Sequence, residues 1–116
     1  MTEKSKFRSY MGFAARSKKI QVGYNTALML IAKRRVKLLI IATDVGDNTK
    51  RKLTQKCVTN NIKYRVFGEA SELSQMTGNV DKGVFAIVDK GFAESICKEI
   101  DLIQSEREVS NGSESI

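Results

Sequence analysis

The fold of this chain is constrained most by two short apolar runs, Leu38–Thr43 (LLIIAT) and Val84–Val88 (VFAIV). A continuous apolar run of this length is typical of a strand buried on both faces of a sheet. Around these runs, apolar residues recur at spacings of three and four, which is typical of helices that pack on one face. The chain therefore predicts a sheet covered by helices on both sides.

The ends of the other elements must be set by glycine, asparagine, aspartate and serine, because the chain has no proline. Helices are predicted over Ser5–Arg16, Gly23–Arg35, Asp47–Asn60, Ala70–Thr77 and Gly91–Ile103, and strands over Ile20–Val22, Leu38–Thr43, Lys63–Phe67 and Val84–Val88. This order predicts an α/β fold, a three-layer α-β-α sandwich with a small mixed central sheet.

A single domain is predicted over residues 1–103. The chain has 116 residues, which is long enough for one buried core, and its 41% of hydrophobic residues is ordinary for a globular protein. The segment Ser105–Ile116 is rich in serine and glutamate and has no apolar periodicity. We therefore expect residues 104–116 to form a disordered, acidic, serine-rich tail.

The composition argues against several classes of function. The longest apolar run, Val36–Ala42, contains Lys37 and is far shorter than a membrane span, and the first residues do not have the pattern of a secretory signal. Histidine is absent, which removes the commonest acid–base residue and metal ligand. We interpret Cys57 and Cys97 as small core residues rather than a redox pair. We expect a cytoplasmic protein with no membrane partner, no metal, no cofactor and no catalytic activity.

Charge is distributed unevenly along the chain. Residues 1–65 carry 16 Lys and Arg against 3 acids, whereas residues 66–116 carry 4 against 10, within a net charge of +7. This asymmetry indicates an anionic partner on one side of the domain, although solubilising surface lysines are an alternative explanation. Nucleic acid is favoured over a membrane surface as the partner. A membrane surface favours a basic amphipathic helix at a terminus, whereas the spacing of the first predicted helix is typical of a helix that packs on the core.

Three segments at the ends of predicted elements are candidates for contact with a polyanion: Lys18–Thr26, Thr43–Lys52 and Met76–Gly83. Each also has a purely structural explanation. Asn25 could pair with a base edge through its amide, or it could cap the second helix. Asp47 could cap the third helix, and the last segment could be a plain turn between glycines.

Several motifs in order resemble the ribosomal protein L-seven-Ae family, and within it the bacterial YlxQ-type branch. The similarity covers about residues 7–100, and it is carried by Gly12–Lys19 (GFAARSKK), Val22–Thr26 (VGYNT), Val36–Val45 (VKLLIIATDV), Ser71–Leu73 with Thr77–Gly78, Val84–Asp89 (VFAIVD) and Asp89–Ala93 (DKGFA). This resemblance implies an α-β-α sandwich that binds RNA kink-turns, which are sharp bends next to sheared G·A pairs.

The resemblance also implies an RNA site. The family's guanine-contacting stretch falls on Gly23, Tyr24, Asn25 and Thr26, its downstream basic positions on Met29 and Lys33, and its nucleotide-packing loop on Gly78, Asn79 and Val80. Thr26 and Met29 depart from the acid and the cation of the family. Tyr24 could stack on a base or pack against the first helix. Cations that relieve phosphate repulsion are expected at Lys18, Lys19, Lys33, Lys50, Arg51 and Lys52.

We therefore expect a monomeric, non-catalytic RNA-binding protein that recognises kink-turn-like structured RNA and associates with the ribosome. Its partners would be kink-turn or ribosomal RNA and ribosomal proteins. One alternative is a protein-interaction module of the same fold, which docks on an acidic protein or on a ribosomal surface. Another is a metal-dependent nuclease in which Asp44, Asp47 and Asp89 hold Mg²⁺.

Overall fold

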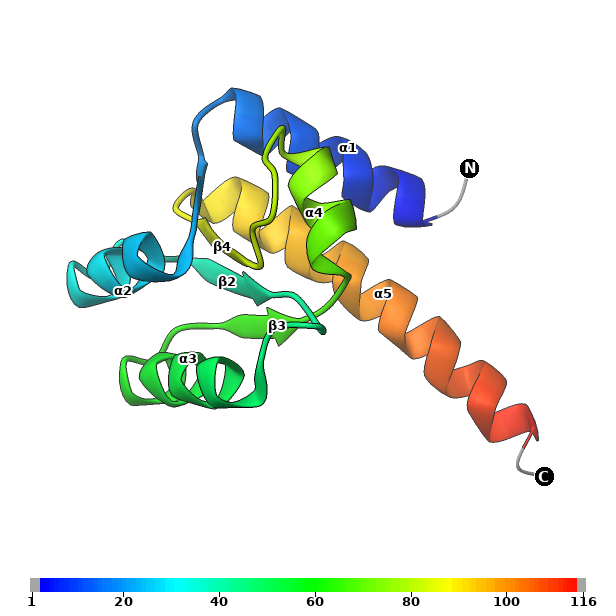
Figure 1. Ribbon diagram of the computed structural model, residues 1–116. Coiled ribbons are helices and arrows are strands. Elements are labelled where there is room, and N and C mark those ends of the chain that lie inside the picture. The colour runs from blue at the N-terminus through cyan, green and yellow to red at the C-terminus, as the bar shows by residue number, and fades with distance from the viewer. Residues whose placement is uncertain (1–2, 115–116) are drawn as a thin grey trace.

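The computed structural model describes residues 3–114, in which a central sheet lies between two layers of helices (Figure 1). The helices are α1 (Glu3–Arg16), α2 (Tyr24–Ala32), α3 (Asp47–Thr59), α4 (Ala70–Met76) and α5 (Lys90–Glu114). The strands are β1 (Ile20–Val22), β2 (Leu38–Ile41), β3 (Tyr64–Val66) and β4 (Val84–Ile87). The predicted α/β class and element order are confirmed.

The sheet is mixed, as the sequence predicts, and its strand order is β1-β4-β2-β3. Strand β4 lies antiparallel to both of its neighbours, with Ala86 opposite Gln21 on one side and Leu39 on the other. Strands β2 and β3 are parallel, and Ile40 lies opposite Arg65. Every residue of β2 and β4 is buried, because both strands are covered on both faces.

Two hydrophobic clusters fill the space between the layers. Helices α1, α4 and α5 cover one face of the sheet, and their cluster includes Phe7, Met11, Leu73, Ile96 and Ile100 together with Leu38, Ile40 and Phe85 of the strands. Helices α2 and α3 cover the other face, and their cluster includes Ala27, Ile31, Leu53 and Cys57 together with Leu39, Ile41 and Ala86. Alternate residues of β2 therefore serve opposite clusters, as the pleat of a strand requires.

The two cysteines lie in different clusters. Cys57 belongs to the cluster under α2 and α3, and Cys97 belongs to the cluster under α1 and α5. Both are buried free thiols. Their burial confirms the interpretation as small core residues. They do not form a redox pair with each other, because the sheet separates them.

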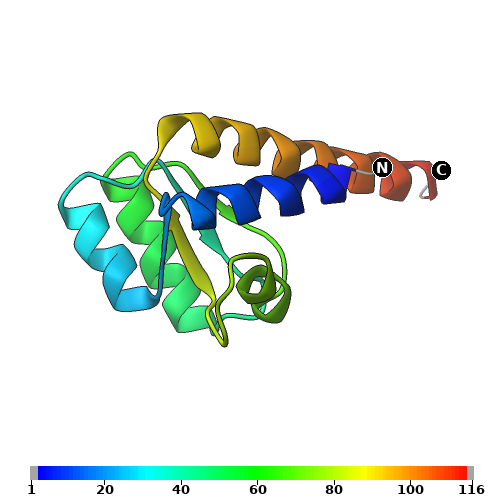
Figure 2. The same ribbon diagram turned by 90° about the horizontal axis from the view of Figure 1, so that it is seen from above.

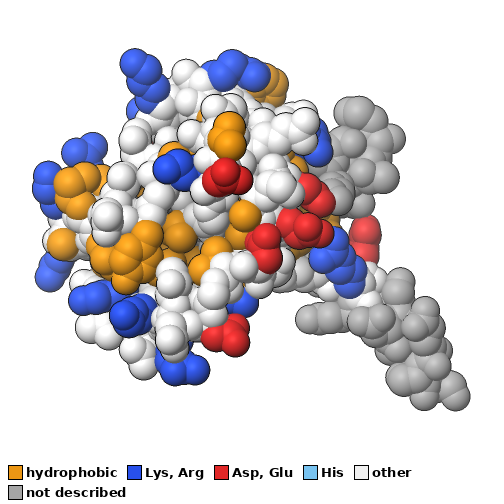
Figure 3. Space-filling view, viewed as in Figure 1, with side chains coloured by type: hydrophobic (Ala, Val, Ile, Leu, Met, Phe, Trp, Pro, Cys, Tyr) orange, Lys and Arg blue, Asp and Glu red, His pale blue; other side chains and the backbone are white. Residues whose placement is uncertain are grey.

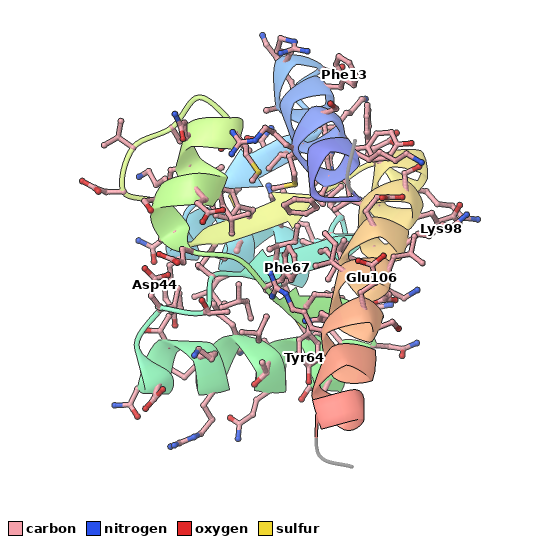
Figure 4. All side chains as sticks on the ribbon, turned by 90° about the vertical axis from the view of Figure 1, so that its right-hand side faces the viewer. Phe13, Asp44, Tyr64, Phe67, Lys98 and Glu106 are labelled. Carbon is pink, nitrogen blue, oxygen red and sulfur yellow. The ribbon has the colours of Figure 1, made fainter. Side chains whose placement is uncertain are left out.

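Helix α5 is longer than predicted. It continues to Glu114, whereas the sequence predicts a helix end at Ile103 and a disordered tail from residue 104. The guanidinium of Arg107 lies 5.6 Å from the centre of the Phe67 ring, so the helix still contacts the core beyond Ile103. Figure 4 shows Phe67 in the middle of the molecule, beside α5. The division of the chain into a domain of residues 1–103 and an acidic, serine-rich tail of residues 104–116 stays a prediction, and residues 115–116 lie outside the described residues.

The edge strand β3 is tied to α5 by an ion pair. Arg65 donates hydrogen bonds of 2.8 and 3.1 Å to the two carboxylate oxygens of Asp101. The hydrogen bond from Arg65 lowers the pKa of Asp101 below its ordinary value. Within the described residues, no helix is long and apolar enough to cross a membrane.

Candidate nucleic-acid interface

Two loops that are far apart in the sequence lie at the same end of the sheet. The amide of Gly23, at the end of β1, donates to the carbonyl oxygen of Val84, at the start of β4, at 2.9 Å. The loop Gly78–Gly83 leads directly into β4. We call the Gly23–Thr26 turn and the Gly78–Val80 loop together the mouth. Helices α2, α3 and α4 all begin at this end (Figure 2).

Gly23 forms the turn between β1 and α2, and this turn places the start of α2 at the mouth end of the sheet. Gly23 has φ 107° and ψ 153°, a conformation that is open almost only to glycine. It is the N-cap of α2, and among the described residues no side-chain hydrogen bond caps this helix. The first N–H groups of the helix therefore stay available for an anion.

Asn25 is not the cap of α2, so the structural explanation for its presence is wrong. It is the second residue of the helix and is exposed. Within the part of the chain that the structure describes, its side-chain amide makes no hydrogen bond. The amide donors and acceptor of Asn25 are therefore free to pair with an external group. Thr26, next to it, is partly buried.

Tyr24 is the first residue of α2, and its side chain faces α3. It packs against the cluster under α2 and α3, which corrects the expectation of packing against the first helix. It also lines a groove of about 320 Å³ between α2 and α3, with Leu28, Lys52, Gln55, Lys56, Thr59 and Asn60. Met29 is exposed on α2.

The loop after α4 is held in one conformation. Gly78 has φ 73°, and the amide of Asn79 donates to the carbonyl oxygen of Ser74 at 2.7 Å. The side chain of Asn79 turns inward and donates to the carbonyl oxygen and the hydroxyl of Thr77, at 3.1 and 3.0 Å. Val80 stands at the tip with 77% of its side chain exposed. Asn79 thus fixes the conformation of the loop, and the loop presents the side chain of Val80 to solvent.

The loop is also fixed at its other end. The carbonyl oxygen of Gly83 accepts from the amide of Ala42 at 2.9 Å. A Cβ atom added at Gly83 would lie only 2.7 Å from Cγ2 of Val45. Glycine is therefore needed where this loop crosses the segment between β2 and α3.

The segment between β2 and α3 is used for internal contacts. Asp44 accepts a hydrogen bond of 2.9 Å from the amide of Ala70 and so caps α4 (Figure 4). The ammonium of Lys50 donates to the carbonyl oxygen of Thr43 at 2.9 Å. The N-cap of α3 is Gly46, so the expectation that Asp47 caps this helix is wrong; Asp47 lies in its first turn. There the negative charge of its carboxylate interacts favourably with the positive end of the α3 dipole.

The predicted cations divide into two groups. Lys50, Arg51 and Lys52 lie in the first turns of α3, at the mouth end. Lys18, Lys19 and Lys33 lie at the opposite end of the sheet, where β1 begins and α2 ends. The structure therefore brings Asn25, Val80 and Lys50 to one end, and it does not bring Lys18, Lys19 or Lys33 there.

Charge differs between the two sides of the mouth. Figure 3 looks onto this end of the molecule, and Lys and Arg side chains lie mainly over α2 and α3. Asp and Glu side chains gather near α4 and α5, and apolar side chains lie between α2 and α3. An anionic ligand at the mouth is therefore drawn toward the side of α2 and α3.

The three aspartates considered as metal ligands do not form one site. Asp44 follows the end of β2 at the mouth, whereas Asp89 follows the end of β4 at the opposite end of the sheet. Asp89 accepts a hydrogen bond of 2.8 Å from the amide of Phe92 and so caps α5. Among the described residues, no three potential ligands come together for a metal ion.

Sequence reasoning did not single out several exposed cations as site residues. Lys82 lies within the candidate segment Met76–Gly83, in the loop that carries Val80, but the family resemblance selects only Gly78, Asn79 and Val80 there. Arg34, Lys37 and Lys63 gather at the opposite end of the sheet. Only the strand order, which the sequence does not reveal, brings Lys37 and Lys63 together.

Comparison with known proteins finds a matching family and RNA-binding relatives. The model of the ribosomal protein L7Ae/L30e/S12e/Gadd45 family matches residues 5–97. The RNA-binding protein YlxQ of Bacillus subtilis is 29% identical over 91 residues, which are 78% of this chain and 91% of that protein. The RNA-binding protein YlxQ of Enterococcus faecium is 34% identical over 91 residues, 78% of this chain and 86% of that protein.

Two solved structures have the same fold. A protein of unknown function from Bacillus halodurans superposes with a TM-score of 0.80 at 30% identity, over 83% of this chain and 97% of that chain. The 15.5kD RNA binding protein of Giardia lamblia superposes with a TM-score of 0.71 at 19% identity, over 89% of this chain and 88% of that chain. At this identity, the second likeness concerns the fold alone.

Proposed function

The chain belongs to the ribosomal protein L7Ae/L30e/S12e/Gadd45 family, and we propose that it binds structured RNA of the kink-turn type at the mouth. The RNA-binding YlxQ relatives support RNA as the ligand. The observation that carries the proposal is the position of Asn25. Its exposed side-chain amide, which bonds to none of the described residues, lies at the end of the sheet that also presents Val80 on a fixed loop.

In this proposal, the mouth contacts an RNA bend in two ways. The amide of Asn25 pairs with a base edge, and the unpaired N–H groups at the start of α2 face a phosphate or a base acceptor. Val80 offers an apolar surface to a nucleotide that leaves the stack. Because the loop of Val80 is held by Ser74 and Gly83, little conformational entropy is lost on binding.

The protein then acts by selecting the bent form from the RNA ensemble. Bending brings phosphates together, and the cations of α3 reduce their repulsion. For contacts with four to six phosphates, log K falls with log[salt] with a slope of about −3 to −5. Thr26 and Met29 stand where the family has an acid and a cation, so the contact through Asn25 carries more of the discrimination.

The test compares two RNAs, a kink-turn and a plain duplex of equal length. We expect Asn25→Ala to weaken binding to the kink-turn by about 1–3 kcal/mol, which is the value of a good base contact, and to leave binding to the duplex unchanged. Asn48→Ala is the matched control, because Asn48 is also an exposed asparagine at the second residue of a helix at this end. Equal losses on both RNAs would contradict a base contact and leave only a general cationic surface.

We further propose that the protein works without catalysis, as a cytoplasmic monomer bound to ribosomal or regulatory RNA. The separation of Asp44 from Asp89 supports the absence of a shared metal site. Incubation of the kink-turn RNA with the protein and Mg²⁺ tests this, since intact RNA is expected. Cleavage that is lost in Asp44→Ala would contradict it.

A further inference from the structure

The end of the sheet opposite the mouth carries a row of lysines. Lys19, Lys37 and Lys63 each immediately precede a strand, and this end is called here the far end. The carbonyl oxygen of Lys19 accepts from the amide of Val88 at 2.9 Å, and the amide of Lys37 donates to the carbonyl oxygen of Ile87 at 2.8 Å. Lys37 and Lys63 precede adjacent strands, whose axes lie about 5 Å apart, and β4 lies between the strands that follow Lys37 and Lys19, whose axes lie about 10 Å apart.

The ends of two helices add further cations to the far end. Lys18 follows α1, and Lys33, Arg34 and Arg35 follow α2. All four are exposed. Lys18 and Arg34 have φ 61° and 58°, in the left-handed region where glycine is the usual residue after a helix. The chain therefore keeps cations at two positions where its own backbone favours glycine.

A hollow of about 500 Å³ opens among these cations. Arg34, Lys37 and Lys63 line it together with Thr59, Asn60 and Asn61, and no carboxylate is among its lining residues. Within the residues that the structure describes, Arg34 and Lys37 form no ion pair with an acid, whereas Lys63 lies near Asp101 and adds to the effect of Arg65 in lowering the pKa of that carboxyl. Cations with nearby amide and hydroxyl groups are suited to the phosphate and sugar oxygens of RNA.

The hollow is continuous with the groove that begins at the mouth. Thr59 and Asn60 line both, and the groove also contains Tyr24, Lys52 and Lys56. Helices α2 and α3 run side by side from the mouth end to the far end (Figure 2). A path with exposed cations along its length therefore joins the mouth to the far end.

We infer that the far end is a second contact surface for the RNA that the mouth binds, and that it holds backbone phosphates of a stem extending along α2 and α3. This inference rests on the proposed function. The row of cations selects a polyanion with regularly spaced charges, and an A-form stem presents these along its backbone. No base is read at the far end, so its contribution depends on the length of the RNA and not on its sequence.

The experiment uses a short kink-turn RNA and two longer forms, in which one stem or the other is extended by a helical turn. The test variant is Arg34→Gln with Lys37→Gln. We expect this pair to weaken binding of one extended RNA at least fivefold, and to reduce its salt slope by about 2, since two phosphate contacts are lost. Binding of the short RNA should change less than twofold. The matched control is Lys6→Gln with Arg8→Gln, two exposed cations of α1, which should leave all three RNAs unaffected.

The outcomes separate the two proposals. Equal losses on the short and extended RNAs, or no loss on any of them, would overturn the far-end surface. Asn25→Ala is measured on the same RNAs. If Asn25→Ala has no effect while the Arg34 and Lys37 pair weakens only an extended RNA, the base contact of Asn25 fails and the phosphate contact at the far end stands.

Discussion

The hydroxyl of Ser74 exchanges two hydrogen bonds with the backbone of Lys82, donating to its carbonyl oxygen and accepting from its amide, each at 2.9 Å. Ser74 is buried in α4, whereas Lys82 is exposed at the end of the loop that carries Val80. The side chain of Ser74 thus holds the loop that carries Val80 against α4. Access of Val80 to a ligand therefore depends on a residue that does not touch the ligand.

Replacing Ser74 by alanine tests this dependence. Ser74→Ala leaves two backbone groups of Lys82 without their partner, and we expect a loss of stability of about 1–2 kcal/mol. Exchange of the Lys82 amide hydrogen should accelerate, and affinity for the kink-turn RNA should fall. Ser71→Ala is the control, because Ser71 is exposed on the same helix. Unchanged exchange at Lys82 in Ser74→Ala would show that the loop is fixed by other contacts.

Gly83 and Val45 provide a second test of the loop. Gly83→Ala places a methyl group against Cγ2 of Val45, and we expect a destabilisation of about 1–3 kcal/mol in urea unfolding. Val45→Ala removes the obstructing methyl groups. The double variant should be less destabilised than the sum of the two single variants by about 1 kcal/mol or more. Simple additivity would mean that the two residues do not meet.

Alkaline pH should destabilise the fold through Cys57. Burial raises the pKa of this thiol from its ordinary value of 9.0 to about 11. Between these values the unfolded chain releases the proton and the folded chain retains it, so stability falls as pH rises from 9 to 11. The full effect is about 2–3 kcal/mol, at about 1.4 kcal/mol for each pH unit.

The measurement is the urea midpoint at about pH 8, below the ordinary thiol value of 9.0, and at about pH 10.5, between that value and the raised pKa of about 11. Lysines and tyrosines also titrate there, so the variant Cys57→Val is needed to isolate the thiol. It should lose less stability over this range than the parent chain. The same slope in both proteins would assign the pH dependence to other groups.

The left-handed conformation of Arg34 predicts opposite effects on stability and on binding. Arg34→Gly relieves a backbone cost of about 1–2 kcal/mol and loses a helix-dipole contact of about 0.3–1 kcal/mol. We therefore expect equal or slightly higher stability, together with weaker binding of an extended RNA. Arg35 has no left-handed backbone, so Arg35→Gly should be destabilising. Chemical unfolding of both variants checks this, and a clear loss of stability in Arg34→Gly would contradict it.

The apolar runs and helical spacings were sufficient to predict the elements and the layers. The sequence contains little information on the order of strands, and this order is what places Gly23 beside Val84 and Lys37 beside Lys63. The family resemblance relates the turn at Gly23 to the loop before Val84, because both belong to the implied RNA site. Nothing local in the sequence relates Lys37 to Lys63.

The sequence did not reveal that the predicted cations divide between the two ends of the sheet, for a physical reason. Lys19 is only four residues from Gly23, but the strand between them carries the chain about 10 Å from one end of the sheet to the other. Proximity in sequence was therefore misleading. Asn25 and Asp47 were considered as caps because of their residue types, whereas glycine occupies both cap positions.

Strand β4 joins β1 to the rest of the sheet, yet it is synthesised after all the other strands. A nascent chain that ends before Val84 has no partner for β1 and leaves one edge of β2 open. Such an intermediate exposes strand edges and apolar side chains, which are the features that chaperones and proteases recognise. The domain can therefore close only after β4 has been synthesised.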